Sequence, residues 1–152
     1  MEQKTWTIDR VTADRYSLFE DMIFWRQTGT ERAPSDGTVS AEIKKELADS
    51  NLYVYAAMEG GRYVGWISLV YIPKVGKWSG HGHIYVDELW VAEPYRRQGC
   101  GKALMARADE LRMQKEATGI RLYVNINNPG AKMLYEGCGY REDGRADFME
   151  KE

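Results

Sequence analysis

The stretch from Asp87 to Leu104, DELWVAEPYRRQGCGKAL, constrains the fold of this chain more than any other. It begins as an apolar strand, breaks at Pro94, and passes through a loop with two glycines into a helical pattern. Gly99 and Gly101 lack a Cβ atom, so backbone N–H groups there can approach a ligand closely. The free amides and the positive dipole end of the following helix would face the same anion. The stretch therefore predicts a strand–loop–helix unit that holds phosphate.

Three cationic side chains accompany this loop, namely Arg96, Arg97 and Lys102. Their positive charge would assist the backbone amides in holding a phosphate. A solvated loop charge is the alternative interpretation for the arginines, and tight turning alone is the alternative for the two glycines.

Composition limits the classes of protein to which the chain can belong. Its 152 residues suit a single domain over 1–152, and the net charge of −2 supplies no overall basic field for a nucleic-acid partner. The two cysteines form neither a CxxC pair nor a Cys/His cluster, so we expect no metal site and a reduced, cytoplasmic setting. No apolar run reaches the length of a leader or a membrane span, and we expect no membrane association.

Hydrophobic periodicity predicts alternating strands and helices along the chain. Strands are predicted at 5–11, 52–58, 62–73, 84–91 and 120–126, with a closing pair that starts at Tyr140 and turns near Asp143-Gly144. Helices are predicted after Thr12 (ending near Gly29), after Ser40, after Gly101 (ending at Gly119 as a left-handed cap), and after Asn128 (ending at Gly137 and Gly139). A hairpin turn is predicted at Gly60-Gly61, and polar loops at 28–38 and 74–83.

The predicted order is β-α-α-β-β-β-α-β-α-β-β, which indicates an α/β (α+β) fold with a mixed sheet. The unit from 84 to 126 supplies a right-handed parallel crossover, and a ligand is expected beyond the carboxyl end of its first strand. An exposed C-terminal strand would allow a homodimer by pairing between two chains.

Two motifs resemble the GNAT superfamily of N-acetyltransferases. The first, Arg96-x-x-Gly99-x-Gly101 after a strand that ends at Val91, is similar to the acetyl-CoA pyrophosphate loop of that family. The second motif is Asn128-x-x-Ala131-x-x-x-Tyr135-x-x-x-Gly139-Tyr140. Together the motifs span 84–140, somewhat over a third of the chain. The resemblance implies the GNAT acyl-CoA N-acyltransferase fold and acetyl-CoA as the cosubstrate.

The resemblance also implies which residues hold the cofactor. The pyrophosphate would lie on the amides from Arg97 through Lys102 with help from Arg96, and this set is Arg96, Arg97, Gln98, Gly99, Cys100, Gly101 and Lys102. The pantetheine arm would pair with the strand edge at Leu89 and Val91, and the Val91 amide would stabilise the oxyanion, an effect of roughly 3 kcal/mol on the barrier. Asn128 would bond to the cofactor arm as well as capping its helix, with Ala131 of the same motif as a further contact.

Catalytic roles follow from the same resemblance. Tyr135 would donate a hydrogen bond to the leaving thiolate, and a packed core aromatic is its alternative interpretation. An acceptor ammonium has a pKa of about 10.4, so a base is useful near neutral pH. Glu88 is the preferred base, directly or through water, and Asp87 is the second choice. A structural hydrogen-bonding carboxylate is the alternative for Glu88.

Three side chains are interpreted as bystanders. Cys100 lies beside amide dipoles that would lower its pKa, but a spectator role is preferred. His81 and His83 are interpreted as loop residues rather than proton shuttles.

The predicted function is acetyl transfer from acetyl-CoA to a primary amine of a small molecule or peptide, directly within a ternary complex. The alternative is a non-catalytic acyl-CoA-binding sensor or regulatory module. A nucleoside triphosphatase is disfavoured because the pattern GxxxxGK[ST] is absent. Aminoglycosides, polyamines, amino acids and peptide N-termini all stay open as acceptors.

Overall fold

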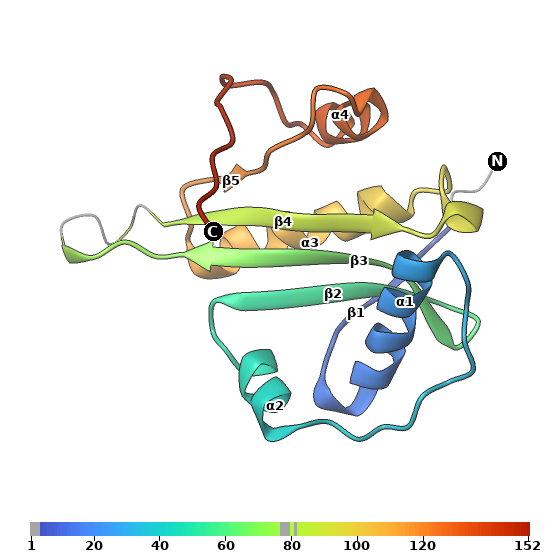
Figure 1. The fold of residues 1–152 in the computed structure, drawn as a ribbon. Helices are drawn as coiled ribbons and strands as arrows, with labels where there is room; N and C mark the ends of the chain where they lie inside the picture. Colours follow the sequence, from blue (N-terminus) through green and yellow to red (C-terminus); the bar gives the residue numbers. More distant parts are fainter. Residues whose placement is uncertain (1–3, 77–79, 81) are drawn as a thin grey trace.

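A five-stranded sheet organises the computed structural model of the chain, which describes residues 4–76, 80 and 82–152 (Figure 1). The strands run in spatial order β1-β2-β3-β4-β5. All neighbours are antiparallel except β4 and β5, which are parallel. The strands are β1 (Thr7–Arg10), β2 (Leu52–Glu59), β3 (Arg62–Ile72), β4 (His83–Val91) and β5 (Ile120–Arg121).

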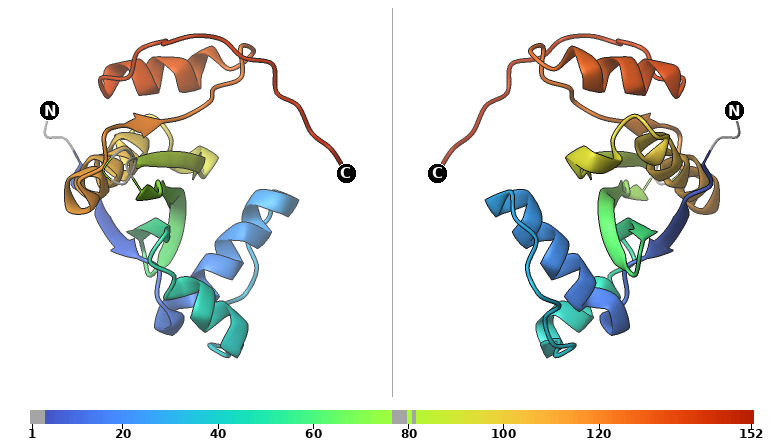
Figure 2. Two further views of the ribbon diagram at one scale, coloured as in Figure 1. Left: turned by 90° about the vertical axis from the view of Figure 1, so that its left-hand side faces the viewer. Right: turned by 90° about the vertical axis from the view of Figure 1, so that its right-hand side faces the viewer.

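Helices cover both faces of this sheet (Figure 2). Helices α1 and α2 lie on one face and α3 lies on the other, whereas α4 lies beyond β5 and above the carboxyl-terminal half of β4 (Figures 1 and 2). The helices are α1 (Tyr16–Thr28), α2 (Ala41–Leu47), α3 (Cys100–Lys115) and α4 (Pro129–Gly137), with short 3₁₀ turns η1 (Ala13–Arg15) and η3 (Glu93–Tyr95). The predicted α/β class with a mixed sheet is confirmed.

Strand β3 contributes to two cores, one on each face of the sheet, and a register shift against β2 makes Val64 an extra residue that interrupts its alternation. Val64 and Ile67 belong to the cluster that includes Leu104 of α3. Tyr63 and Trp66 belong to the cluster that includes Met22 of α1. All of these side chains are buried. Because burying one large apolar side chain stabilises a fold by about 1.5–3 kcal/mol, the two clusters hold the sheet firmly between the helices.

Helix termini that carry a capping residue in the sequence form as predicted. Ser40 caps α2 by accepting a hydrogen bond from the Ile43 amide at 3.2 Å. Asn128 caps α4 in the same way, with 3.1 Å between its Oδ1 atom and the Ala131 nitrogen. Gly29 ends α1 with a left-handed φ of 73°. Each cap satisfies or redirects a backbone group that the helix itself cannot pair.

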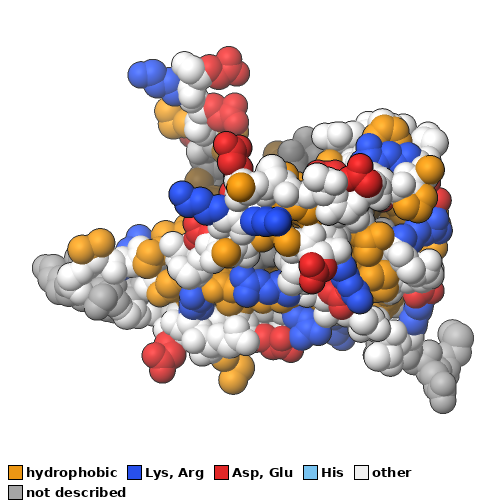
Figure 3. Space-filling view, turned by 90° about the horizontal axis from the view of Figure 1, so that it is seen from below, with side chains coloured by type: hydrophobic (Ala, Val, Ile, Leu, Met, Phe, Trp, Pro, Cys, Tyr) orange, Lys and Arg blue, Asp and Glu red, His pale blue; other side chains and the backbone are white. Residues whose placement is uncertain are grey.

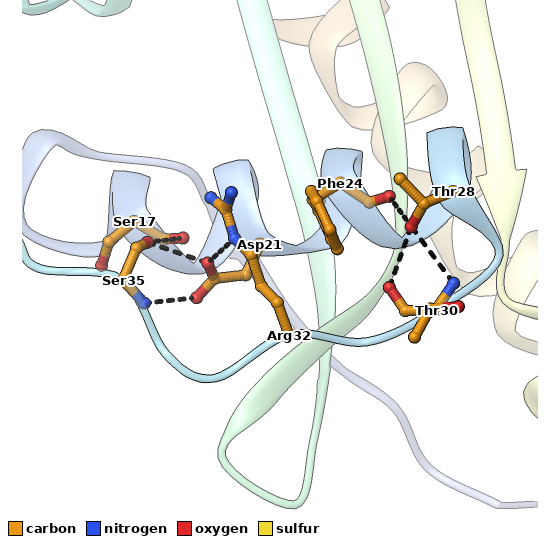
Figure 4. Close-up of polar contacts among 7 residues, drawn as sticks. All are labelled: Ser17, Asp21, Phe24, Thr28, Thr30, Arg32 and Ser35. Atoms are coloured by element: carbon orange, nitrogen blue, oxygen red, sulfur yellow. Dashed lines mark hydrogen bonds and ion pairs between the residues drawn. The ribbon is translucent and has the colours of Figure 1, made fainter.

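The predicted loop after α1 is tied back to that helix (Figure 4). The Asp21 carboxylate accepts hydrogen bonds from Arg32 Nε at 2.9 Å and from the Ser35 hydroxyl at 2.8 Å. Thr28 Oγ1 accepts from the Thr30 amide at 3.2 Å. These contacts fix the connection between α1 and α2 against the outer side of α1. The second predicted loop, 74–83, includes positions 77–79 and 81, which lie outside the described residues.

Two predicted element ends are wrong. Helix α3 ends at Lys115, and Glu116 takes the left-handed conformation (φ 52°) that was expected of Gly119. The strand predicted over 120–126 ends at Arg121. Downstream, Asn125 turns the chain, because its side chain accepts from the Asn127 amide at 2.8 Å. Such local side-chain bonds compete with the ladder of a sheet.

The closing pair of strands is also wrong, because residues 141–152, all of them described, contain no strand. This segment leaves the body of the molecule on the side of α1 (Figure 2). Its large apolar side chains, Phe148 and Met149, are 85% and 87% exposed. Charged residues surround them, so the segment has no apolar face to bury against the sheet. The homodimer expected from a C-terminal strand stays a prediction.

The distribution of charged side chains on the surface agrees with the near-neutral net charge of the chain. Seen from below, Lys and Arg side chains are interspersed with Asp and Glu (Figure 3). Within the described part of the chain, no helix is both long enough and apolar enough to cross a membrane.

Gly65 marks a tight contact between β3 and β4, and its replacement is our first prediction. A Cβ atom at this position would lie 2.9 Å from the Trp90 carbonyl oxygen. Gly65→Ala should therefore lower the free energy of unfolding by about 1–3 kcal/mol, measured by urea denaturation. Gly37→Ala is the matched control, because a Cβ atom there meets no atom within 4 Å. Equal stability of the two variants would contradict this account.

Candidate active site

The candidate site begins where β4 loses its second neighbour. Strand β5 pairs with β4 at two positions, Ile84 with Ile120 and Tyr85 with Arg121. On its other edge β4 stays paired with β3 as far as Val91. The β3–β4 register shifts between Ser68 and Leu69, which makes Asp87 an extra residue of β4. A bulge of this kind bends its strand and increases the local twist.

We call the edge of β4 from 86 to 91 that faces away from β3 the open edge. The Ala92 amide donates to the Val64 carbonyl oxygen of β3 at 2.8 Å. Because successive amides of a strand point to alternate edges, the Val91 and Leu89 amides point to the open edge. This is the geometry that the predicted pairing with a pantetheine arm requires.

Arg96 lies at the carboxyl end of the open edge. Its Nε atom donates to the Val91 carbonyl oxygen at 2.8 Å. A guanidinium carries five N–H donors, so this bond leaves others available to an anion. Arg96 thus connects the strand to the loop, a position that the motif alone did not indicate.

The loop between η3 and α3 presents consecutive backbone amides. Arg97 has a φ of 60° and Gly99 a φ of 84°. Backbone that alternates between left- and right-handed conformations forms a concave nest of N–H groups. The first bond of α3 runs from the Ala103 amide to the Gly99 carbonyl at 3.0 Å. The amides of the three preceding residues, Cys100, Gly101 and Lys102, thus precede the hydrogen-bond ladder of the helix.

Two contacts hold the shape of this loop. The Trp6 indole donates to the Gln98 carbonyl oxygen at 3.0 Å, which ties the loop to the chain before β1. The Gln98 side chain donates to the Pro94 carbonyl oxygen at 3.1 Å. The loop is therefore organised before any ligand arrives.

The two glycines of the motif, Gly99 before α3 and Gly101 in its first turn, serve different purposes. Gly99 needs its positive φ, which side chains rarely adopt. Gly101 allows close approach, because a Cβ atom there would lie 3.0 Å from Leu134 Cδ2 of α4. The phosphate contact predicted for both glycines stays a prediction.

Tyr135 is the residue next to that contact. Its phenol is half-buried and packs edge-on against Tyr140, with ring centroids 6.3 Å apart. Burial, with a smaller effect from Cys138, raises the pKa of Tyr135 above its ordinary value. The phenol is therefore protonated at neutral pH and available as a hydrogen-bond donor.

The two candidate bases have different surroundings. The Glu88 side chain accepts a hydrogen bond from Arg26 Nη1 of α1 at 2.9 Å. Asp87 lies exposed at the bulge, where its charge helps, after burial, to raise the pKa of Tyr85. Arg26 is a site residue that no sequence pattern indicates, because its partner is 62 residues away along the chain.

Aromatic rings form a continuous row beside Glu88 on the same face of the sheet. Trp66 and Trp90 have centroids 5.3 Å apart, and Trp25 of α1 lies 5.9 Å from Trp90. The Arg26 guanidinium carbon lies 5.0 Å from the centre of the Trp66 ring. The Arg26–Glu88 pair thus lies against a row of aromatic side chains.

A cavity of about 210 Å³ lies further along this face, between α1, α2 and the start of β2. Ser68 of β3 lines the cavity and is the register partner of Glu88. The remaining lining is mostly apolar, from Val11, Tyr16, Phe19, Ile43, Leu47, Leu52, Tyr53 and Val54, with Arg10 and Glu46 as the charged members.

The three expected bystanders fall in different surroundings. Cys100 is buried in the core, and burial raises the pKa of its thiol to about 12 instead of lowering it. His83 is the first residue of β4 rather than a loop residue, and burial is the largest of the causes that lower its pKa. His81 lies outside the described residues.

Comparison with known proteins identifies the family. A sequence model of the acetyltransferase (GNAT) family matches residues 17–140, which is most of the chain, so the chain belongs to this family. The predicted resemblance is therefore confirmed.

Individual relatives are more distant. The chain is 33% identical over 98 residues to the aminoalkylphosphonate N-acetyltransferase of Salmonella typhimurium, covering 63% of the chain and 61% of that protein. It is 34% identical over 73 residues to the chloroplastic GCN5-related N-acetyltransferase 4 of Arabidopsis thaliana, covering 47% of the chain. The match spans a quarter (25%) of the Arabidopsis protein.

Solved structures share the fold over nearly the whole chain. An aminoglycoside acetyltransferase from an uncultured soil metagenomic sample superposes with a TM-score of 0.77 at 22% identity, covering 98% of this chain and 100% of that one. AAC(6')-Iy, solved with the bisubstrate analogue CoA-S-monomethyl-acetylneamine, gives a TM-score of 0.78 at 15% identity, covering 98% and 99%. At these identities the likeness concerns the fold alone.

The buried thiol of Cys100 gives the second prediction. With a pKa raised to about 12, the thiol stays protonated through the range in which an ordinary cysteine, with a pKa of about 8.5, titrates. In a Cys138→Ser variant, a disulfide reagent at pH 8.5 should modify the native protein at least about a hundredfold more slowly than the urea-unfolded protein, because only the thiolate reacts. Rapid modification of native Cys100 would show that the loop activates this thiol.

Proposed function

We propose that the chain is an acetyl-CoA-dependent N-acetyltransferase that acetylates a primary amine by direct transfer within a ternary complex. One observation carries the proposal: the open edge of β4 continues directly into a loop of consecutive free amides. An extended amide-containing arm and a pyrophosphate, joined as they are in acetyl-CoA, would meet these two features in order. The acetylated amines named for the Salmonella and metagenomic relatives support a small-molecule acceptor.

The binding roles follow from the geometry of the loop. The amides from Arg97 to Lys102 would hold the pyrophosphate, with charge from Arg96, Arg97 and Lys102. Asn128 uses its carbonyl oxygen to cap α4, so its NH₂ group is left to bond the cofactor arm. Ala131 follows on the same helix as a further contact.

The chemical step moves one acetyl group and takes two protons from the acceptor ammonium. The first proton goes to Glu88 or to water, with Asp87 as the second candidate. The acceptor nitrogen then attacks the thioester carbonyl, a C–N bond forms, and the C–S bond breaks. The Val91 amide stabilises the oxyanion, and Tyr135 donates to the departing thiolate. The second nitrogen proton ends on the CoA thiol. In the protein, Glu88 must share its oxygens between the first proton and Arg26.

The setting of the enzyme follows from its thiols. Both cysteines are free, which suits a reducing, cytoplasmic compartment. A polycationic acceptor gains no particular support, because acidic and basic side chains are interspersed around the site.

Calorimetric titration with CoA tests the binding half of the proposal. Gly99→Ala should weaken CoA binding at least about tenfold, because a left-handed non-glycine residue costs about 1–2 kcal/mol and displaces the loop amides. Gly119→Ala is the control, since its φ is ordinary and a Cβ atom there meets no atom within 4 Å. If the unaltered protein does not bind CoA at millimolar concentration, the proposed function is wrong.

Steady-state kinetics test the catalytic half. Tyr135→Phe and Glu88→Gln should each lower kcat by about a hundredfold, the usual size of an acid or base contribution, and leave CoA affinity nearly unchanged. Tyr123→Phe is the matched control, because Tyr123 is 78% exposed and lies after β5.

Two other outcomes would revise this account. Full rates in both variants would refute the assigned roles. Tight CoA binding without acetyl transfer to any amine would favour the non-catalytic acyl-CoA-binding module.

A further inference from the structure

The Arg26–Glu88 ion pair lies where the acceptor amine must bind. Glu88 precedes Leu89, whose amide points to the open edge, so a nitrogen held by Glu88 lies beside the proposed thioester site. Arg26 approaches Glu88 from α1, with 2.9 Å between Nη1 and Oε2. Any acceptor that uses Glu88 therefore meets the guanidinium as well.

The pair is open to solvent and easily exchanged. The side chains of Arg26 and Glu88 are 42% and 46% exposed. Ion pairs this exposed contribute little to stability, so a ligand can replace the partner of either charge at small cost. Arg26 also makes a cation–π contact with the Trp66 ring, whose centre lies 5.0 Å from the guanidinium carbon. This contact holds the guanidinium near the site when Glu88 pairs with a ligand instead.

Charge balance decides which ligand makes this exchange favourable. A simple monoamine that pairs with Glu88 leaves Arg26 without its carboxylate and places two positive charges close together. An amine that also carries an oxyanion gives each side chain a new partner. Arginine suits this task, because its planar fork binds carboxylate and phosphate-like groups through two parallel hydrogen bonds.

We propose that the acceptor is a small zwitterion, with a primary ammonium that binds Glu88 and a carboxylate or phosphonate-type oxyanion that binds Arg26. This inference rests on the proposed function and specifies its substrate class. The acceptor inserts between the two side chains, and Glu88 exchanges the guanidinium for the ammonium. The ammonium then gives one proton to Glu88 or to water, and its nitrogen attacks the thioester carbonyl. The C–S bond breaks, and the second nitrogen proton ends on CoA, which leaves as the thiol. Arg26 touches the acceptor away from the reacting atoms and is a specificity-determining residue.

Matched acceptors test the proposal. Acetyl transfer from acetyl-CoA is measured with 4-aminobutanoate against butylamine, and with 3-aminopropylphosphonate against propylamine. We expect kcat/KM to be at least tenfold higher for the member of each pair that carries the oxyanion. Arg26→Gln should abolish this preference by lowering the rate with the zwitterions while leaving the rate with the plain amines equal or higher. Arg26→Lys, which keeps the charge without the fork, should restore part of the preference.

Arg32→Gln is the matched control variant. Arg32 also pairs with a carboxylate of α1 at 2.9 Å, that of Asp21, and lies 4.8 Å from an aromatic ring, that of Phe24 (Figure 4). It lies in the loop after α1 and faces Asp21 of that helix rather than Glu88, so its removal should leave the preference intact. A merely structural role of Arg26 would lower the rates with both members of a pair equally.

Three results would overturn the proposal. They are equal rates with both members of each pair, a preference that survives Arg26→Gln, and tight CoA binding with no transfer to either zwitterion. Each of these results concerns the acceptor and leaves CoA binding in place. Failure to bind CoA would instead remove the proposed function itself.

Discussion

The loss of pairing between β4 and β5 is the constraint on which the whole site depends. The backbone amides of a strand inside a sheet are hydrogen-bonded to the neighbouring strands. Only a strand with an unpaired edge can donate these hydrogen bonds to a ligand. Here the parallel ladder stops after two residue pairs, while β3 holds the opposite edge of β4 in place. The bulge at Asp87 lies at the start of the open edge. Strand β4 is therefore held by β3 along one edge, and its other edge can form hydrogen bonds with a ligand.

Contacts of the chain beyond the open edge hold that edge and the loop after it in a fixed position. Arg96 binds the last carbonyl oxygen of the edge, and Trp6 and Gln98 hold the loop that follows. On the other face of the site, α1 contributes Trp25 and Arg26 to a row of rings and charges. The loop after β4, the residue before β1 and helix α1 thus meet near the carboxyl-terminal half of one strand.

Local chemistry explains which features the sequence predicts well. The caps at Ser40 and Asn128 and the turn at Gly29 depend on residues within a few positions, so they form as expected. Strand β5 ends early, and the chain beyond it turns at Asn125 through a local side-chain bond that strand periodicity does not register. The closing strands fail because residues 141–152 have apolar residues but no apolar face. The Arg26–Glu88 contact joins two distant elements, and no pattern along the chain encodes such a pair.

The contact between Gly101 and Leu134 joins the two halves of the family signature. Gly101 lies in the first turn of α3, next to the proposed pyrophosphate loop, and Leu134 of α4 is the neighbour of Tyr135. A methyl group at position 101 would meet the end of the Leu134 side chain, so α3 and α4 pack closely at this point. The proposed holder of the cofactor and the proposed donor to its leaving group are therefore neighbours in the packing of two helices. A substitution at this contact would be felt at both.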